Sequence, residues 1–204
     1  MIDNSIHLPI LHRDFFEDED DKTYIKILNK EIDRLIDLND DCWGRLDTKD
    51  DTWCSYRINK DILFNNDIFE AVSYKLKDAI LQYTMGVRSD TQRHQVHLVD
   101  SCVFSSRSNP YPDFKSDDSQ HFRGILFLRA EKTAGNVIIK NPFIPPRIKF
   151  HHTGDGPFRE YFVSSNKTGD LMIFPSHVEW KMADFTNDDG SKDLRFVTFN
   201  VTVA

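Results

Sequence analysis

Two segments of the chain carry residues that could bind a metal ion. The first contains Tyr111-Pro112-Asp113, and the second contains His177. Mononuclear non-haem Fe(II) sites use two histidines and one carboxylate and leave coordination positions open for a substrate and oxygen. Asp113 and His177 are therefore the candidate metal ligands, and His121 in a neighbouring loop is a third candidate.

Two aromatic residues lie close to these candidates in the sequence. Tyr111 lies two residues before Asp113, and Trp180 lies three residues after His177. The indole of tryptophan offers no lone pair to a metal, and a neutral phenol is a poor ligand for Fe(II). Two interpretations stay open: a weak site for Fe, Zn or Ni, or a cavity that Trp180 fills without any metal.

Composition limits the kinds of function that the chain can have. With 204 residues and 39% hydrophobic content the chain can bury one sizeable core. A net charge of -7 argues against binding along nucleic-acid phosphates, and no apolar run approaches the ~20 residues of a membrane span. The start of the chain lacks the basic and apolar parts of a signal peptide, so we expect a cytoplasmic protein.

Cysteines and acidic residues give little indication of a site. The three cysteines are scattered, odd in number and without Cys-x-x-Cys spacing, so we expect buried free thiols. The acidic run 17–21 is expected to be a solvated segment at the start of a helix. Asp117 and Asp118 are expected in a solvated turn.

The elements that must position these residues change character along the chain. Apolar residues at helical spacing predict one helix around 25–36, capped by Asp20 or Asp21, and another around 66–83, capped by Asn65 or Asn66. From residue 94 the apolar period becomes two, which is typical of strands. The expected strands are 95–104, 124–130, 136–140, 147–150, 160–164, 170–174, 178–183 and 194–203.

Helices followed by many short strands predict the fold class α+β, mainly β. We expect a double-stranded β-helix, which is a cupin-like jelly roll, with the N-terminal helices packed on one sheet. The chain is interpreted as one domain over 1–204, with a helical part at 1–93 and the barrel at 94–204.

The whole chain resembles the 2-oxoglutarate/Fe(II)-dependent dioxygenase superfamily, most closely a branch of uncharacterised oxygenases from tailed phages and marine bacteria. The resemblance rests on Trp53-Cys54-Ser55 between the helices, on the strand Gly124-Ile125-Leu126-Phe127-Leu128, and on Gly169 to Ser176, which match Gly-x-Leu-x-x-Phe-Pro-Ser. In such proteins a His-x-Asp precedes the first of these strands and a second histidine follows the Phe-Pro. In this chain those two histidine positions are Tyr111 and Trp180.

The resemblance implies roles for single residues. Tyr111, Asp113 and Trp180 occupy the catalytic positions, and Asp113 with His177 would hold the metal. Arg195 matches the arginine that pairs with the far carboxylate of 2-oxoglutarate, and Phe127 stands where several relatives have a tyrosine that binds the keto acid. An active protein would use Fe(II) and 2-oxoglutarate to hydroxylate a substrate carbon.

Two other functions stay open beside the oxygenase, and both need no cofactor. One is a non-catalytic, virion-associated or otherwise partner-binding module that keeps the barrel for stability. The other is a cupin-like small-molecule binder. The expected partner is an unidentified small molecule or protein, without nucleic acid or membrane. A homodimer or a virion component is the expected assembly, in the host cytoplasm or the virion if a phage encodes the chain.

Overall fold

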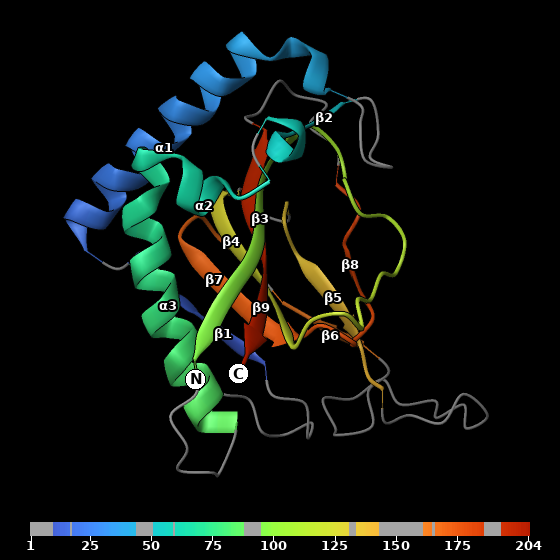
Figure 1. Ribbon diagram of the computed structural model, residues 1–204. Coiled ribbons are helices and arrows are strands. Elements are labelled where there is room, and N and C mark those ends of the chain that lie inside the picture. Colours follow the sequence, from blue (N-terminus) through green and yellow to red (C-terminus); the bar gives the residue numbers. More distant parts are fainter. Residues whose placement is uncertain are drawn as a thin grey trace.

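The computed structural model describes residues 10–16, 18–43, 51–58, 60–87, 95–130, 134–142, 161–164, 166–185 and 193–204. Two antiparallel sheets form the body of the molecule (Figure 1). The larger sheet has the strand order β1-β7-β4-β9-β3-β2, and the smaller has the order β6-β5-β8. Their bounds are β1 Leu11–Asp14, β2 Thr52–Cys54, β3 Val96–Ser106, β4 Phe122–Arg129, β5 Val137–Lys140, β6 Tyr161–Val163, β7 Asp170–Pro175, β8 Trp180–Met182 and β9 Leu194–Val203.

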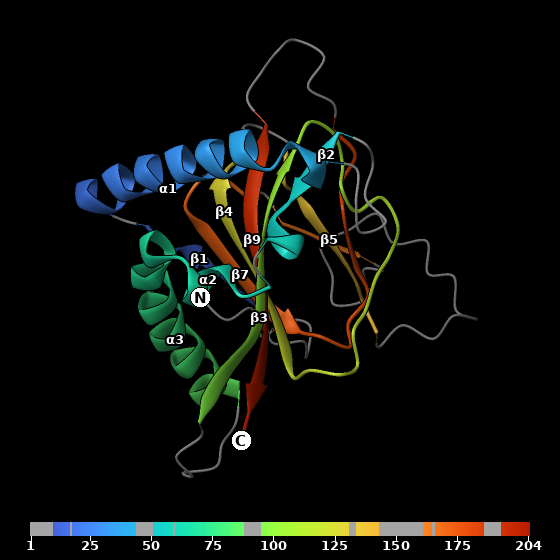
Figure 2. The same ribbon diagram turned by 45° about the horizontal axis from the view of Figure 1, so that its top comes forward.

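Helices cover one face of the larger sheet. Helices α1 (Glu19–Leu38) and α3 (Asp67–Val87) lie over its outer face, with the single turn α2 (Ile62–Asn65) before α3 (Figures 1 and 2). Short 3-10 turns at Asp40–Cys42 and Ser55–Arg57 connect these helices to the sheet. The expected packing of N-terminal helices on one sheet is thus observed.

The two long helices begin at side-chain caps. The Asp18 carboxylate accepts a hydrogen bond from the Asp21 N–H at 2.7 Å, so α1 starts earlier than predicted and the expected cap at Asp20 or Asp21 is wrong. Those later acidic residues fill the first turn, where the helix dipole favours negative charge. The expected cap at Asn66 is confirmed, because its Oδ1 accepts from the Ile68 N–H at 3.0 Å.

Two apolar clusters lie on opposite faces of the larger sheet. One fills the space between this sheet and the helices, and the other fills the space between the two sheets. Strand β9 contributes to both by alternation, since Val197 and Phe199 face the helices while Leu194 and Phe196 face the smaller sheet. We call these two sides the helix side and the barrel side.

Gly124 is required by the close approach of a ring. It lies opposite Phe199 in the β4–β9 register. A Cβ atom at this position would lie 2.0 Å from Cζ of the Phe199 ring, which is buried. Only glycine therefore lets this ring cross the strand, which explains the small residue at the start of the predicted apolar strand.

Most predicted strands are confirmed, with shifted ends. The run 178–183 shortens to β8, and the run 95–104 extends to Ser106. The predicted strand 147–150 lies outside the described residues. Strands β1 and β2 are additions that the sequence did not predict, because each is too short for a period of two to be recognised.

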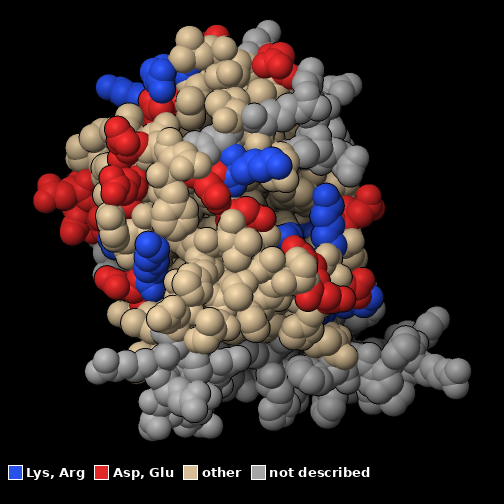
Figure 3. Space-filling view, in the orientation of Figure 1, with Lys and Arg blue, Asp and Glu red and all other residues tan. Residues whose placement is uncertain are grey.

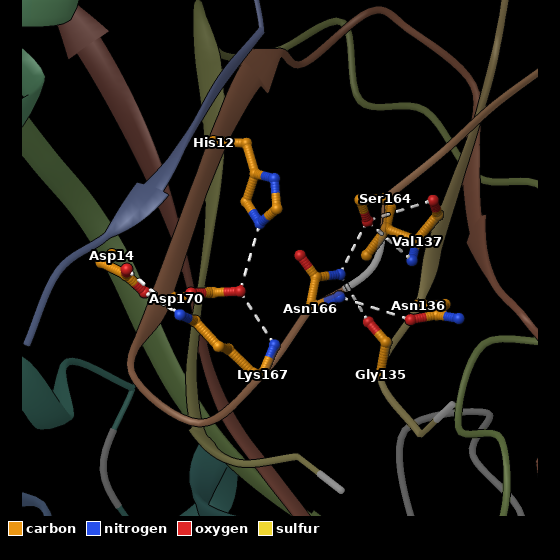
Figure 4. A network of polar contacts seen from close by, with 9 residues as sticks. All are labelled: His12, Asp14, Gly135, Asn136, Val137, Ser164, Asn166, Lys167 and Asp170. Atoms are coloured by element: carbon orange, nitrogen blue, oxygen red, sulfur yellow. Dashed lines mark hydrogen bonds and ion pairs between the residues drawn. The ribbon is translucent and has the colours of Figure 1, made fainter. Parts of the chain in front are cut away.

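A polar network holds the turn that leads into β7 (Figure 4). His12 Nε2 on β1 lies 3.3 Å from Asp170 Oδ2, and the Lys167 N–H donates to the same oxygen at 2.8 Å. The Asn166 amide donates to the Gly135 carbonyl oxygen at 2.7 Å. These bonds tie the start of β7 to the edge strand β1 and to the turn before β5.

Charge on the surface is mixed. Figure 3 shows basic side chains scattered among acidic ones on the face of Figure 1. Among the described residues, no helix is both long and apolar enough to cross a membrane.

Candidate functional site

The structure brings Tyr111 and Trp180 together on the barrel side. The backbone N–H groups of Lys115 and Trp180 donate to each other's carbonyl oxygens at 2.8 and 2.9 Å, and the Met182 N–H donates to the Tyr111 carbonyl oxygen at 3.0 Å. This pairing places the segment after β3 beside β8. The two aromatic rings meet edge to face, with centroids 5.1 Å apart.

Further rings enclose this pair. Tyr111 packs against Phe104 at 5.5 Å between centroids, and Trp180 packs against Phe174 at 5.8 Å. Trp180 is only 1% exposed. Its indole N–H has no hydrogen-bond partner within the described part of the chain, so contacts with the ring rather than with this N–H hold Trp180 in place. Phe196, on β9, completes the contact with Tyr111.

The chemistry of these rings is unsuited to Fe(II). Burial, and next the nearby thiols of Cys102 and Cys54, raise the pKa of the Tyr111 phenol well above its usual range. The phenol therefore stays neutral, and a neutral phenol is a poor metal ligand. Trp180 offers only an N–H donor.

The remaining candidate ligands lie at the surface. Asp113 and His177 are both exposed. His121 is exposed too, and its Nδ1 accepts a hydrogen bond from the Val203 N–H at 3.2 Å. Among the residues that the structure describes, no group of three or more His, Cys, Asp or Glu side chains could hold a metal ion. The described residues thus do not fit an Fe(II) centre.

Arg195 lies on the helix side, away from Tyr111 and Trp180. Its Nη1 donates to the Asn29 carbonyl oxygen at 2.8 Å, its Nη2 forms an ion pair with Asp33 of α1, and its Nε donates to Ser105 Oγ at 3.3 Å. The structure therefore does not bring Arg195 to Asp113. The physical reason is alternation along β9, which turns Phe196 rather than Arg195 toward the barrel side.

Phe127 does lie on the barrel side, but it has only packing contacts to offer. Its buried ring lies 6.3 Å from that of Phe196. Without a hydroxyl group it cannot donate the hydrogen bond that a tyrosine at this position would give.

A cavity of about 190 Å³ remains beside Tyr111. Its wall combines aromatic, thiol, hydroxyl and charged groups: Tyr56, Lys60, Asp100, Ser101, Cys102, Phe104, Tyr111, Arg123 and Thr198. We call it the Tyr111 pocket.

Of the residues in the wall of the Tyr111 pocket, only Tyr111 was predicted from the sequence, and Arg123 is a charged residue that was not. Its guanidinium lies 5.7 Å from the centre of the Trp180 ring, its Nε donates to Asn200 Oδ1 at 3.0 Å, and its Nη2 lies 3.3 Å from Asp117 Oδ2. Asp117 therefore has a partner and is more than a solvated turn residue. The available signal was Arg123 in a mostly apolar strand that has one other charged residue, Arg129 at its end.

Comparison with known proteins identifies the fold. No family model matches the sequence, and no curated protein matches it. Among solved structures, HygX from Streptomyces hygroscopicus with nickel and 2-oxoglutarate bound has a TM-score of 0.59 at 10% identity, over 99% of this chain and 87% of HygX. The non-haem alpha-ketoglutarate-dependent carbocyclase SnoK from nogalamycin biosynthesis has a TM-score of 0.62 at 8% identity, over 99% and 84% of the two chains.

A third structure agrees with these two. An oxidoreductase of the 2OG-Fe(II) oxygenase family from Burkholderia pseudomallei has a TM-score of 0.50 at 11% identity, over 82% of this chain and 77% of the other. At such low identities the likeness extends to the fold alone. The chain therefore has the fold of 2-oxoglutarate/Fe(II) oxygenases.

Proposed function

We propose that this chain is a double-stranded β-helix of the oxygenase type that works without iron, as a binding module. The observation that carries the proposal is the edge-to-face contact of Tyr111 with the buried Trp180, at the two positions that the family resemblance assigns to histidines. A phenol kept neutral and an indole fill the space that a metal and its ligands would occupy.

The strand order supports the double-stranded β-helix. Successive strands from β3 onward pass from the larger sheet (β3, β4) to the smaller (β5, β6), back to the larger (β7), to the smaller (β8) and again to the larger (β9). Such alternation closes two sheets around one interior, as in a jelly roll.

The direct test is an anaerobic titration with Fe(II) and 2-oxoglutarate. We expect no visible charge-transfer band from a chelated keto acid, and no succinate after oxygen is admitted, because the described residues supply no convergent ligand set. A band together with succinate formation would overturn the proposal and restore the oxygenase.

A gain-of-ligand variant tests the origin of the site. The double variant Tyr111→His, Trp180→His returns imidazoles to both positions and should gain Co(II) or Fe(II) binding, read by absorbance. The matched double variant Tyr111→Phe, Trp180→Phe keeps the aromatic packing and should bind neither metal. Equal metal binding by the two variants would argue against an iron site at these positions.

A second candidate, a small-molecule binder, is favoured by the Tyr111 pocket. Its volume of about 190 Å³ suits a ligand of few atoms, and the cations Lys60 and Arg123 in its wall suit a carboxylate. Calorimetry with metal-free 2-oxoglutarate as the probe should show binding that weakens about tenfold or more in Arg123→Gln, the loss of one charge-assisted contact. Heat release that is the same for both proteins would exclude this pocket as the site.

The module's partner is a separate part of the proposal. A second copy of the chain would make a homodimer, which light scattering of the purified protein detects. A monomer at all concentrations would leave a different partner, such as a virion component, as the proposed one.

A further inference from the structure

Cys102 in the wall of the Tyr111 pocket is in contact with a second cysteine, Cys54. The Sγ atoms of Cys54 on β2 and Cys102 on β3 are 2.8 Å apart, closer than two non-bonded sulfur atoms usually lie. The strands are antiparallel neighbours in which Cys54 faces Phe104, so the two thiols are diagonal across the pair. A disulfide needs about 2.05 Å between the sulfur atoms, so these two atoms are less than about 1 Å from bonding distance.

Access differs between the two thiols. Cys102 lines the pocket and is 7% exposed, whereas Cys54 lies behind it and is 2% exposed. A reagent in the pocket therefore meets Cys102 first. Cys42, the third cysteine, is also buried but lies in a different apolar cluster, on the helix side.

We propose that Cys54 and Cys102 form a reversible dithiol–disulfide pair that a small hydroperoxide oxidises through the Tyr111 pocket. The Cys102 thiolate attacks the terminal peroxide oxygen, the O–O bond breaks, and the other oxygen leaves as an alcohol, or as water from hydrogen peroxide, after taking a proton. The Cys54 sulfur then attacks the resulting sulfenic acid, the S–O bond breaks, and water leaves with the Cys54 proton. Two electrons pass from the two thiols to the peroxide.

Each of the two sulfur atoms accepts a hydrogen bond. Ser55 Oγ donates to Cys102 Sγ at 3.6 Å, and the Tyr56 N–H donates to Cys54 Sγ at 3.5 Å. Such donors stabilise a thiolate, and the cations Lys60 and Arg123 lie in the same pocket wall. Burial acts against them and raises the pKa of the Cys102 thiol, so the reaction is slow at neutral pH and the reduced pair is long-lived.

The disulfide would have a structural consequence. Strand β2 is only three residues long and lies at the edge of the larger sheet. A bond between residues 48 positions apart constrains the unfolded chain and fastens β2 to β3. The inference does not depend on whether the pocket holds a ligand, because the sulfur contact and the access to Cys102 exist without one.

The experiment is a titration of the native protein with hydrogen peroxide, followed by thiol counting in denaturant and by mass spectrometry of unreduced peptides. We expect the count to fall from three thiols to one, a peptide cross-link between Cys54 and Cys102, an upward shift of Tm, and full reversal by dithiothreitol. The variant Cys42→Ser, which removes the other buried thiol, should form the same cross-link.

Three results would overturn the proposal: three free thiols at excess peroxide, a cross-link through Cys42 or between two molecules, or over-oxidised Cys102 beside a free Cys54. In Cys54→Ser, Cys102 should stop at a sulfenic acid that dimedone traps. If this variant does not fold, the thiol count of the unaltered chain still decides the question.

Discussion

Strand β9 contributes alternate residues to two layers that differ in chemistry. On the helix side, Val197 and Phe199 pack into a continuous apolar cluster beneath α1 and α3. On the barrel side, Phe196 packs against Tyr111, and Thr198 lines the Tyr111 pocket. The helix side has an apolar interior and an outer hollow of about 320 Å³ between α1 and β4, whereas the barrel side combines the Tyr111–Trp180 ring pair with the Tyr111 pocket.

Arg195 and Arg123 differ in the same way between the helix side and the barrel side. Arg195 on the helix side is 4% exposed, and the hydrogen bonds to Asn29 and Ser105 and the ion pair with Asp33 use its guanidinium. Arg123 on the barrel side keeps part of its guanidinium beside a cavity. Arg195 is thus engaged within the fold, whereas Arg123 borders a pocket in which it could contact a ligand.

The largest expected effect comes from removing the buried Trp180 ring. Trp180→Ala should lower the free energy of unfolding by about 3–5 kcal/mol, because the removed indole is fully buried. The control Trp180→Phe keeps a ring and removes the unpaired N–H, so it should change stability by less than about 1.5 kcal/mol. Urea unfolding measures both. Similar losses of stability in the two variants would show that a ring at position 180 does not by itself stabilise the fold.

Arg195 tests the helix side. Arg195→Met should lower the free energy of unfolding by about 2–4 kcal/mol, because Asn29 and Asp33 lose their buried partner. Asp33→Asn should lose only about 0.5–1 kcal/mol, since the Asp33 side chain is 55% exposed. Denaturant curves give both values. A stable Arg195→Met protein that had lost 2-oxoglutarate binding would instead support the keto-acid role that the sequence predicted.

Much of the fold was predictable from the sequence. The spacing of apolar residues predicted the two long helices and most strands, because this spacing shows which face of an element is buried. Short edge strands such as β1 and β2 gave no such signal. The cap at Asp18 was missed because several neighbouring acidic residues could have capped the helix equally well.

The candidate site was less predictable, since a site depends on contacts between distant segments. The sequence pairs Tyr111 and Trp180 only as the two positions without the expected histidines, and the structure brings their rings into contact. It could not assign the side of β9 on which Arg195 lies, because a one-residue shift of register exchanges the two faces. Nor could it bring Cys54 to Cys102, whose contact spans 48 positions.

Gly124 tests how tightly the helix side is packed. Gly124→Ala places a Cβ atom 2.0 Å from the buried Phe199 ring, so we expect a loss of about 1–3 kcal/mol in the free energy of unfolding. Phe199→Leu shortens the side chain that would clash, and in the double variant the alanine should cost much less. A double-mutant cycle measures this coupling. Strictly additive losses would mean that the ring does not set the requirement for glycine.

The smallest effect concerns an ion pair at the edge of the helix side. Arg34 donates to Glu31 at 2.7 and 2.8 Å and lowers the pKa of the Glu31 carboxyl, with a further hydrogen bond from Asn66. Because the folded pKa lies below the unfolded value of about 4.3, this stability is present above that pH and is lost as the pH falls through the folded pKa.

Glu31→Gln should therefore lower the free energy of unfolding by about 0.5–1 kcal/mol at pH 7, a modest value since the Arg34 side chain is 57% exposed, and by progressively less as the pH falls through the folded pKa of Glu31. Urea unfolding at a series of pH values gives the difference. Glu19→Gln, in an exposed pair with Lys22, is the matched control and should change less. If Glu31→Gln lost the same stability at low pH, packing around Glu31 rather than its charge would stabilise this edge. Side-chain packing would then contribute more than ion pairs to stability on both sides of the larger sheet.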